Sequence, residues 1–253
     1  GYVGGSVSVE NSFFERATVN LRYLGDSFSS SEINFTAQPE FIFPLKEITL
    51  KVAADIDYLS GSFERNYLNT SDIKYSFLNL GVLPSLVYVN DDLTLSLGVA
   101  AYLSMDSENS ETEFSIHPRV NASYRLVDEL LIAYGGLDGG IHQNTYYSFI
   151  QKNPYVSPTQ HIAPTSELYN AVGYNVRASY GKEENKALFK LNSFNGFNTG
   201  LEGYEQGNSF EVNYDDITTL SVFGELKVEV NDSFSLGANS TFSSYDTTDQ
   251  PEA

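Results

Sequence analysis

The sequence has 253 residues, a formal net charge of −19 and a pI near 4.3, with 14 Lys and Arg against 33 Asp and Glu. A surface this acidic repels nucleic acid, which proteins hold mainly through Lys and Arg on its phosphates, so nucleic acid is excluded as a partner. The chain contains no Cys, which excludes disulfide bonds, thiolate zinc sites and Cys nucleophiles within it.

The remaining composition favours an all-β fold. Eighteen Tyr and seventeen Phe supply large side chains that are common in strands, and only 19% of the residues are charged. No apolar run approaches the roughly 18 residues that a membrane-spanning helix needs, whereas a spanning strand needs only about 9–11 residues with apolar side chains at alternate positions. We expect a single domain over residues 1–253, because β-barrels often reach this length as one unit.

Apolar and polar residues alternate along much of the chain, which is the period of a β-strand. Phe114 and Ile116, for example, fall on one face of their segment, and His117 and Arg119 fall on the other. The pattern predicts about twelve strands. We place them, in chain order, at residues 2–9, 17–23, 33–43, 48–58, 75–88, 93–103, 113–126, 130–137, 168–180, 187–191, 220–230 and 234–242.

The connections between these strands alternate in length. Tight turns are predicted at residues 10–12, 44–46, 90–92, 127–129, 182–185 and 231–232. Longer stretches rich in acidic residues, Ser, Asn and Gly lie between them, at residues 25–31, 59–72, 104–111, 138–166 and 197–208. In an up-and-down sheet all tight turns fall at one end, as in outer-membrane barrels with short periplasmic turns and long extracellular loops.

A water-soluble β-sandwich also alternates apolar and polar residues, so alternation alone does not separate the two classes. The long predicted strands, the asymmetric connections and the aromatic residues near strand ends favour the membrane. We therefore predict an antiparallel, up-and-down transmembrane β-barrel of about 12 or more strands. Because an unpaired strand edge is costly in hydrocarbon and the last residues read as a loop, we expect the chain to be part of a longer barrel.

Two stretches are similar to a known family. One is YNVRASYGKEENKALF at residues 174–189, and the other runs from GNSFEV at 207–212 through LSVFGELKV at 220–228 to Tyr245. Both resemble TonB-dependent-receptor-like outer-membrane barrels of the Bacteroidota type, with the second half of the chain matching best. The resemblance implies a place in the outer membrane of a Gram-negative bacterium and energised uptake of a ligand through a plugged lumen.

The sequence carries no recognisable plug domain or TonB-contacting box, which is a departure from that family. Transport or uptake of a solute, as in a porin-like or receptor-like barrel, is nevertheless the function we expect. Two alternatives stay open: a non-transporting structural subunit of an outer-membrane protein complex, and a soluble β-rich carbohydrate-binding module. We expect no enzymatic activity, because no catalytic group stands out; His117, for example, lies mid-strand between polar neighbours.

Charged and polar residues on the wet face of the predicted strands are candidates for lining the lumen. Both signs of charge are present, which favours ion pairs and hydrogen bonds inside a barrel over a sharply selective filter. The candidates are Arg16, Arg22, Lys51, Asp55, Asp57, His117, Arg119, Arg125, Arg177, Lys190, Glu225 and Lys227.

The stretch at residues 138–166 is the strongest functional candidate among the loops, because connections of this length are commonly lids or binding loops. It carries aromatic side chains that could stack on sugars or pack against a partner, although a plain external loop fits equally well. Its candidate ligand or partner residues are Tyr146, Tyr147, Phe149, Tyr155 and His161.

We expect no cofactor and no bound metal as a rule. The acidic hairpin tip at Asp106, Glu108, Glu111 and Glu113 could share a divalent cation such as calcium with anionic lipid headgroups, although it lacks an Asp-x-Asp-x-Asp-Gly loop. Loss of activity or stability on chelation is the test of this hypothesis. The expected partners are outer-membrane lipid and other outer-membrane or periplasmic proteins.

Overall fold

The computed structural model of the chain describes most of its residues. They are residues 1–8, 13–27, 29–63, 72–127, 131–156, 161–173, 176–191, 210–231 and 234–247.

Twelve strands and one short helix make up this structure. They are β1 (Tyr2–Ser8), β2 (Phe14–Gly25), β3 (Ser30–Leu45), β4 (Ile48–Phe63), β5 (Ile73–Val89), β6 (Leu93–Asp106), β7 (Glu111–Val127), β8 (Leu131–Gln143), α1 (Tyr146–Lys152), β9 (Pro164–Gly173), β10 (Val176–Leu191), β11 (Phe210–Asn231) and β12 (Phe234–Thr247). No helix among the described residues is long and apolar enough to cross a membrane.

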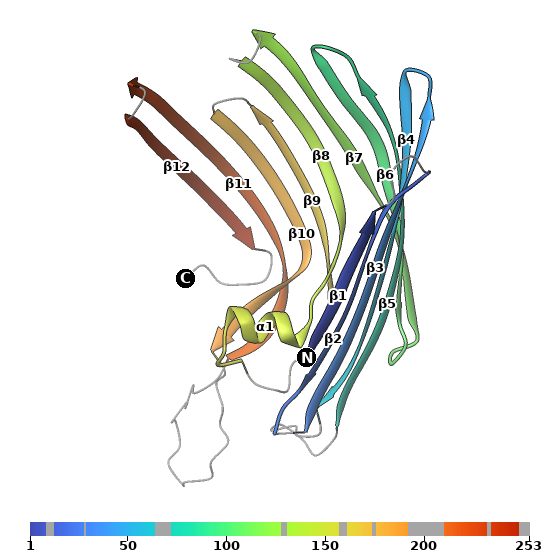
Figure 1. The fold of residues 1–253 in the computed structure, drawn as a ribbon. Helices are drawn as coiled ribbons and strands as arrows, with labels where there is room; N and C mark the ends of the chain where they lie inside the picture. The colour runs from blue at the N-terminus through green and yellow to red at the C-terminus, as the bar shows by residue number, and fades with distance from the viewer. Residues whose placement is uncertain are drawn as a thin grey trace.

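The strands form one antiparallel sheet in which every strand pairs with its neighbours in the sequence, in the order β1 to β12. This confirms the predicted up-and-down arrangement and the predicted number of strands. The sheet is long and strongly curved, and α1 lies on its concave side near the lower end in Figure 1. In the described sheet, β1 and β12 are the two edge strands.

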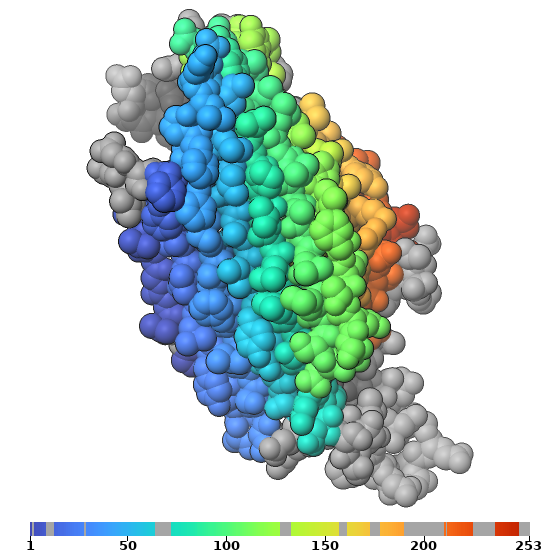
Figure 2. Space-filling model, turned by 90° about the vertical axis from the view of Figure 1, so that its right-hand side faces the viewer, coloured from blue at the N-terminus to red at the C-terminus, as the bar shows by residue number. Residues whose placement is uncertain are grey.

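The two faces of the sheet confirm the predicted alternation, with apolar side chains outside as expected for a transmembrane barrel. On β7, Phe114 is 63% exposed on the convex face, whereas His117 on the opposite face is only 7% exposed. Glu32 and Asn34 are likewise buried on the concave side of β3. Figure 2 looks onto the convex face, where the strands form a continuous surface. Apolar side chains outside and polar ones inside are what a barrel in lipid requires.

The ends of the sheet differ as predicted. Connections of two to five residues alternate with connections of four to twenty residues, and the longer ones all lie at the end that carries α1. We call this the long-connection end. At the opposite end β3 and β4 join through a tight turn in which Lys46 has a φ of 55°.

The predicted boundary between the ninth and tenth strands was wrong. The alternation of residues 168–180 suggested one strand followed by a turn at 182–185, whereas β9 ends at Gly173 and β10 runs continuously through 182–185. Gly173 pairs with Arg177 and Val172 pairs with Ala178. Paired residues are both odd or both even, so the alternation passes through this hairpin in phase and does not reveal it.

The prediction that residues 138–166 form one continuous loop was also wrong. Its first residues extend β8 to Gln143, its last residues begin β9 at Pro164, and α1 lies between them. Asp215 and Asp216, which lie between two of the predicted strands, belong to β11. Strands that extend beyond their apolar stretch are paired by backbone hydrogen bonds, which a pattern of side chains does not report.

Candidate functional site

Residues 144–156, which we call the inward segment, fold back onto the concave face of the sheet. The helix in this segment begins at a capping box: the Thr145 hydroxyl accepts a hydrogen bond from the Ser148 amide at 3.0 Å, and the Ser148 hydroxyl accepts one from the Thr145 amide at 3.2 Å. Such a pair satisfies amides that a helix N-terminus otherwise leaves without partners. The Thr-x-x-Ser spacing was therefore a local signal for α1 that the reading of this stretch as a loop overlooked.

A buried carboxylate holds the start of this helix. Glu32, on β3, is 3% exposed, and its Oε2 and Oε1 accept hydrogen bonds from the amides of Tyr146 at 2.6 Å and Tyr147 at 3.0 Å. The Tyr75 hydroxyl on β5 donates a third bond to Oε2 at 2.9 Å. A carboxylate is stabilised at a helix N-terminus by the free amides and by the helix dipole. Glu32 thereby joins β3, β5 and the inward segment.

The neighbouring Arg22, a predicted lumen residue, contacts the same helix. Its guanidinium carbon lies 4.5 Å from the ring centroid of Tyr147, a cation–π distance. Its Nη2 donates to Asn34 Oδ1 at 3.1 Å, and Asn34 Nδ2 donates in turn to Asp57 Oδ1 at 2.7 Å. Two predicted lumen residues, Arg22 and Asp57, are thus linked through Asn34 on the inner face.

Apolar side chains of the inward segment fill the space between two distant parts of the sheet. Tyr146 packs edge-on against Phe63 of β4, with ring centroids 5.0 Å apart, and Phe149 packs against Phe189 of β10 at 5.9 Å. Phe149 is 1% exposed. The cluster also contains Leu59, Phe77, Val156, Ile162 and Val212. An apolar core therefore lies on the otherwise polar side of the sheet.

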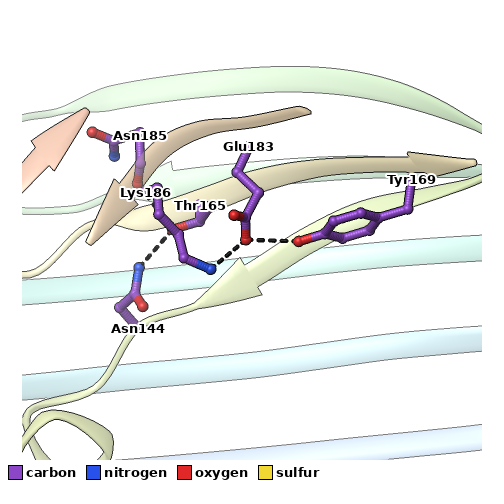
Figure 3. Close-up of polar contacts among 6 residues, drawn as sticks. All are labelled: Asn144, Thr165, Tyr169, Glu183, Asn185 and Lys186. Atoms are coloured by element: carbon purple, nitrogen blue, oxygen red, sulfur yellow. Dashed lines mark hydrogen bonds and ion pairs between the residues drawn. The ribbon is translucent and has the colours of Figure 1, made fainter. Parts of the chain in front are cut away.

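A second carboxylate site lies on β9 and β10 and depends on a bulge. The pairing of β10 with β11 shifts register between Glu183 and Lys186, and Asn185 has a left-handed φ of 58°. In a regular strand, residues three apart point to opposite faces; one extra residue brings both side chains to the same face. Glu183 accordingly forms an ion pair with Lys186 and accepts a hydrogen bond from the Tyr169 hydroxyl at 2.6 Å (Figure 3).

The bulge also ties this site to the start of the inward segment. Asn144 Nδ2 donates to Thr165 Oγ1 at 2.8 Å, and the Thr165 hydroxyl donates to the Asn185 carbonyl at 2.9 Å (Figure 3). The Asn185 side chain donates to the Pro164 carbonyl at 2.8 Å. The two strands β9 and β10 and the segment are therefore connected by polar groups that are already paired with one another.

A further chain of buried amides runs below the inward segment toward β6. Gln143 Nε2 donates to the Asn144 carbonyl at 2.9 Å, and its Oε1 accepts from Asn79 at 2.8 Å. Asn79 Oδ1 accepts from the Ser104 hydroxyl at 2.6 Å. Ser104 on the concave wall is thus linked to Asn144 through the side chains of Asn79 and Gln143.

The other predicted lumen residues form separate pairs. Near the tight-turn end, Arg16 lies 2.9 Å from Glu40, and Lys51 lies 3.7 Å from the same carboxylate. Asp55 accepts a hydrogen bond from Gln38 at 3.1 Å. These contacts agree with an interior of ion pairs and hydrogen bonds.

Two predicted residues on β7 are also paired. His117 lies 3.0 Å from the Ser115 hydroxyl and packs edge-on against Tyr102, with ring centroids 6.0 Å apart. Arg119 Nε lies 2.8 Å from Asp138 on β8. His117 is thus held by neighbours that give it no catalytic arrangement.

Five predicted lumen residues remain. Arg125 is exposed at the tight-turn end of β7. Arg177, Lys190, Glu225 and Lys227 belong to β10 and β11, but their side chains lie outside the part of the structure that is described. Whether any of the lumen candidates contacts a solute stays a prediction.

The aromatic candidates of the inward stretch separate into two groups. Tyr146 and Phe149 are buried in the apolar cluster, so in this arrangement their side chains contact the protein itself. Tyr147 lies against the Arg22 guanidinium. Tyr155 is 69% exposed, and His161 is exposed with its ring 5.9 Å from that of Tyr214. Only these last two are open to a ligand or partner.

The prediction missed the central residues of both carboxylate sites. Glu32, Tyr75, Tyr169, Glu183 and Lys186 were not among the candidates. One available signal was a Gly directly opposite each Tyr: Gly61 pairs with Tyr75 and Gly181 pairs with Tyr169. Within the described ranges, no group of three or more His, Cys, Asp or Glu side chains is arranged to hold a metal ion.

Comparisons with known proteins identify the fold but no close relative. No protein-family model and no curated protein matches the sequence. Among solved structures, the copper transporter OprC superposes with a TM-score of 0.59 at 12% identity, over 97% of this chain and 46% of that protein. The pyoverdine outer membrane receptor FpvA from Pseudomonas aeruginosa PAO1, bound to pyoverdine, has a TM-score of 0.48 at 12% identity, over 99% and 44%.

The chain thus spans less than half the length of these solved proteins. Its twelve-stranded antiparallel sheet has the fold of part of an outer-membrane receptor barrel of the TonB-dependent type. The predicted fold class is confirmed.

Proposed function

We propose that the chain forms part of a TonB-dependent-receptor-like β-barrel in the bacterial outer membrane, which takes up or transports a solute. The observation that supports this most is the distribution of side chains: large apolar residues cover the convex face, whereas Glu32, Asn79 and His117 are buried on the concave face. In water this arrangement would expose the apolar face; in lipid it is the arrangement that a barrel needs.

The similarity to OprC supports the proposal at the level of the fold. The names of the solved proteins suggest the class of solute, a metal ion or a metal-carrying siderophore, and that class is part of the proposal. The Bacteroidota-type likeness rests on residues 174–189 and 207–245 alone. Outer-membrane lipid is the proposed partner of the convex face, and periplasmic proteins are proposed partners in energised uptake.

The first experiment is fractionation of cells that express the full-length protein, followed by gel electrophoresis with and without boiling. We expect the protein in the outer membrane and a change in mobility on boiling, because a closed barrel stays compact in detergent until it is heated. A soluble protein without a mobility change would refute the proposal.

A non-transporting structural subunit is the second candidate function. It is favoured by the apolar core under the inward segment and by the mutual pairing of the inner polar groups, which leave little of this end of the sheet open to a solute. Replacing residues 146–156 by a Gly/Ser linker separates the two functions. Altered solute uptake with an intact barrel supports transport, whereas unchanged uptake with loss of a co-purifying protein supports the structural subunit.

The acidic hairpin tip remains a proposed site for a divalent cation shared with anionic lipid headgroups, because the tip side chains by themselves form no group arranged to hold a metal ion. In the structure the Asp106 carboxylate accepts hydrogen bonds from the amides of Glu108 at 3.0 Å and Asn109 at 3.2 Å, which shape the turn. A fall in barrel stability after chelation, restored by calcium, would support cation binding there.

A further inference from the structure

The inward segment extends across the hollow of the curved sheet and is attached on both sides. On one side its helix is hydrogen-bonded to Glu32 of β3. On the other side the Phe210 amide of β11 donates to the Tyr155 carbonyl at 2.9 Å, and Val156 forms an isolated bridge with Phe210. β3 and β11 are far apart in the strand order, so the segment joins two walls that do not touch through the sheet.

The attachments on the two sides differ in one respect. On the β11 side they are backbone hydrogen bonds and apolar contacts of the sort that also hold strands together. On the β3 side, Tyr146 packs against Phe63 and Tyr147 lies against Arg22, and in addition one buried carboxylate accepts both helix amides. Around Glu32, the described hydrogen bonds come from the helix and from Tyr75.

This geometry makes the Glu32 contact the one that can open. If α1 moves away, the carboxylate and the helix amides both regain water, so the broken hydrogen bonds are largely replaced. The β11 side can stay attached as a hinge. Breaking the contact would uncover Phe63 and Tyr75 of the apolar cluster, which pack against Tyr146 and Glu32.

We infer that residues 144–156 form a lid over the concave face at the long-connection end, and that the Glu32 carboxylate is the latch that holds this lid closed. The inference rests on the proposed function, in which the concave face is the wall of a solute path. It adds a named closing element from within the chain and a single residue that controls it.

The test measures access to a buried position under the lid. Leu59 is 0% exposed and lies in the apolar cluster with Tyr146 and Phe149 of the lid, and the chain has no native Cys. Leu59→Cys, made in the full-length protein, is treated on intact cells with a charged maleimide that does not cross membranes. Its labelling rate is compared alone and together with Glu32→Ala, with Glu32→Gln, and with the control Asp72→Ala, which removes an exposed carboxylate at the same end.

We expect Glu32→Ala to raise the labelling rate roughly tenfold or more, because it removes the acceptor that holds both helix amides. Glu32→Gln keeps the size of the side chain and should raise the rate by less, and it serves as the test variant if Glu32→Ala does not reach the membrane. Asp72→Ala should leave the rate unchanged. Fast labelling before any change to Glu32, or equally slow labelling in both Glu32 variants, would overturn the lid.

A companion substitution separates failure of the lid from failure of the proposed function. Glu108→Cys lies at an exposed tip of the long-connection end and should be labelled on intact cells, whereas Asn90→Cys at a tight turn should be labelled only after the membrane is permeabilised. If both are labelled equally, or neither is, the proposed orientation and membrane location fail, and the lid fails with them. If they behave as expected, the Leu59 result decides the lid alone.

Discussion

Two carboxylate sites on the concave face are built from the same three residue types, Glu, Tyr and Gly, but they stabilise different parts of the structure. At the first, Tyr75 lies over Gly61 of the next strand and donates to Glu32; at the second, Tyr169 lies over Gly181 and donates to Glu183. The first carboxylate also binds the amides of α1, from a segment more than 100 positions away in the sequence. The second binds Lys186 from its own strand.

The difference shows that the same set of residues can stabilise either a contact between distant segments or a single strand. Which of the two it stabilises depends on the groups that donate the other hydrogen bonds to the carboxylate. Glu32 is stabilised by a helix that must first be brought to it, so its contribution depends on the fold of the whole sheet. Glu183 is stabilised by a bulge three residues away, so it forms once β9 to β11 are paired. Disturbing the first site should therefore affect the inward segment, and disturbing the second should affect β10 locally.

The largest effect is expected from Glu32→Ala. It leaves two helix amides and the Tyr75 hydroxyl without their buried acceptor, and we expect a loss of about 3 kcal/mol in the free energy of unfolding. Urea unfolding of the protein in lipid vesicles measures this, with Asp72→Ala as the exposed control. A loss no larger than that of the control would mean that the buried Glu32 carboxylate contributes no more to stability than an exposed one.

The next largest effects are expected from substitution of the two glycines opposite the tyrosines, and the two losses in the free energy of unfolding should differ in size. A Cβ on Gly61 would lie 2.3 Å from the Tyr75 ring, and a Cβ on Gly181 would lie 2.5 Å from the Tyr169 ring. Tyr75 is 4% exposed and enclosed by the apolar cluster, whereas Tyr169 is 40% exposed and free to shift. We expect Gly61→Ala to lower the free energy of unfolding by about 2 kcal/mol and Gly181→Ala by about 1 kcal/mol. Equal losses in urea unfolding would contradict the proposed difference in packing.

Lys186→Ala tests the local site. Glu183 would keep only the Tyr169 hydroxyl as a partner, and because the Lys186 side chain is partly exposed we expect a loss of about 1 kcal/mol. The same strand offers a matched control, because Lys182 pairs with Glu184 at 2.6 Å on the exposed side. Lys182→Ala should cause no measurable change in the unfolding midpoint, and a loss equal to that of Lys186→Ala would show that burial of Glu183 is unimportant.

The smallest effect is expected from Asn185→Gly at the bulge. Gly adopts the left-handed conformation of Asn185 without strain, so the substitution removes only the hydrogen bond to the Pro164 carbonyl, a loss of about 0.5–1 kcal/mol. Asn185→Ala should cost about 1 kcal/mol more, because a Cβ disfavours this conformation. If Ala proves as stable as Gly, the bulge does not depend on the left-handed residue.

Much of the sheet could be predicted because its signals are local. Phe114, Ile116 and their alternation with His117 and Arg119 indicated a strand with one apolar and one polar face, and the structure has both. The strand count and the uneven ends followed from the same period and from the spacing of turn residues. The hairpin at 174–175 was missed because it preserves the alternation, and β10 was divided at Lys182–Asn185 because a polar run within a strand resembles a turn.

The sequence by itself determined the central part of most strands and which face of each strand is apolar, because both depend on a period of two along neighbouring residues. The tertiary structure alone decided that residues 144–156 turn inward and that Tyr146 and Phe149 are buried there. It also decided that Glu32, which was not among the predicted lumen residues, accepts the hydrogen bonds of the helix amides beside the predicted residue Arg22. The physical reason is distance: the Glu32 carboxylate and the Tyr146 amide are 114 positions apart, and only the curvature of the completed sheet brings them within 2.6 Å.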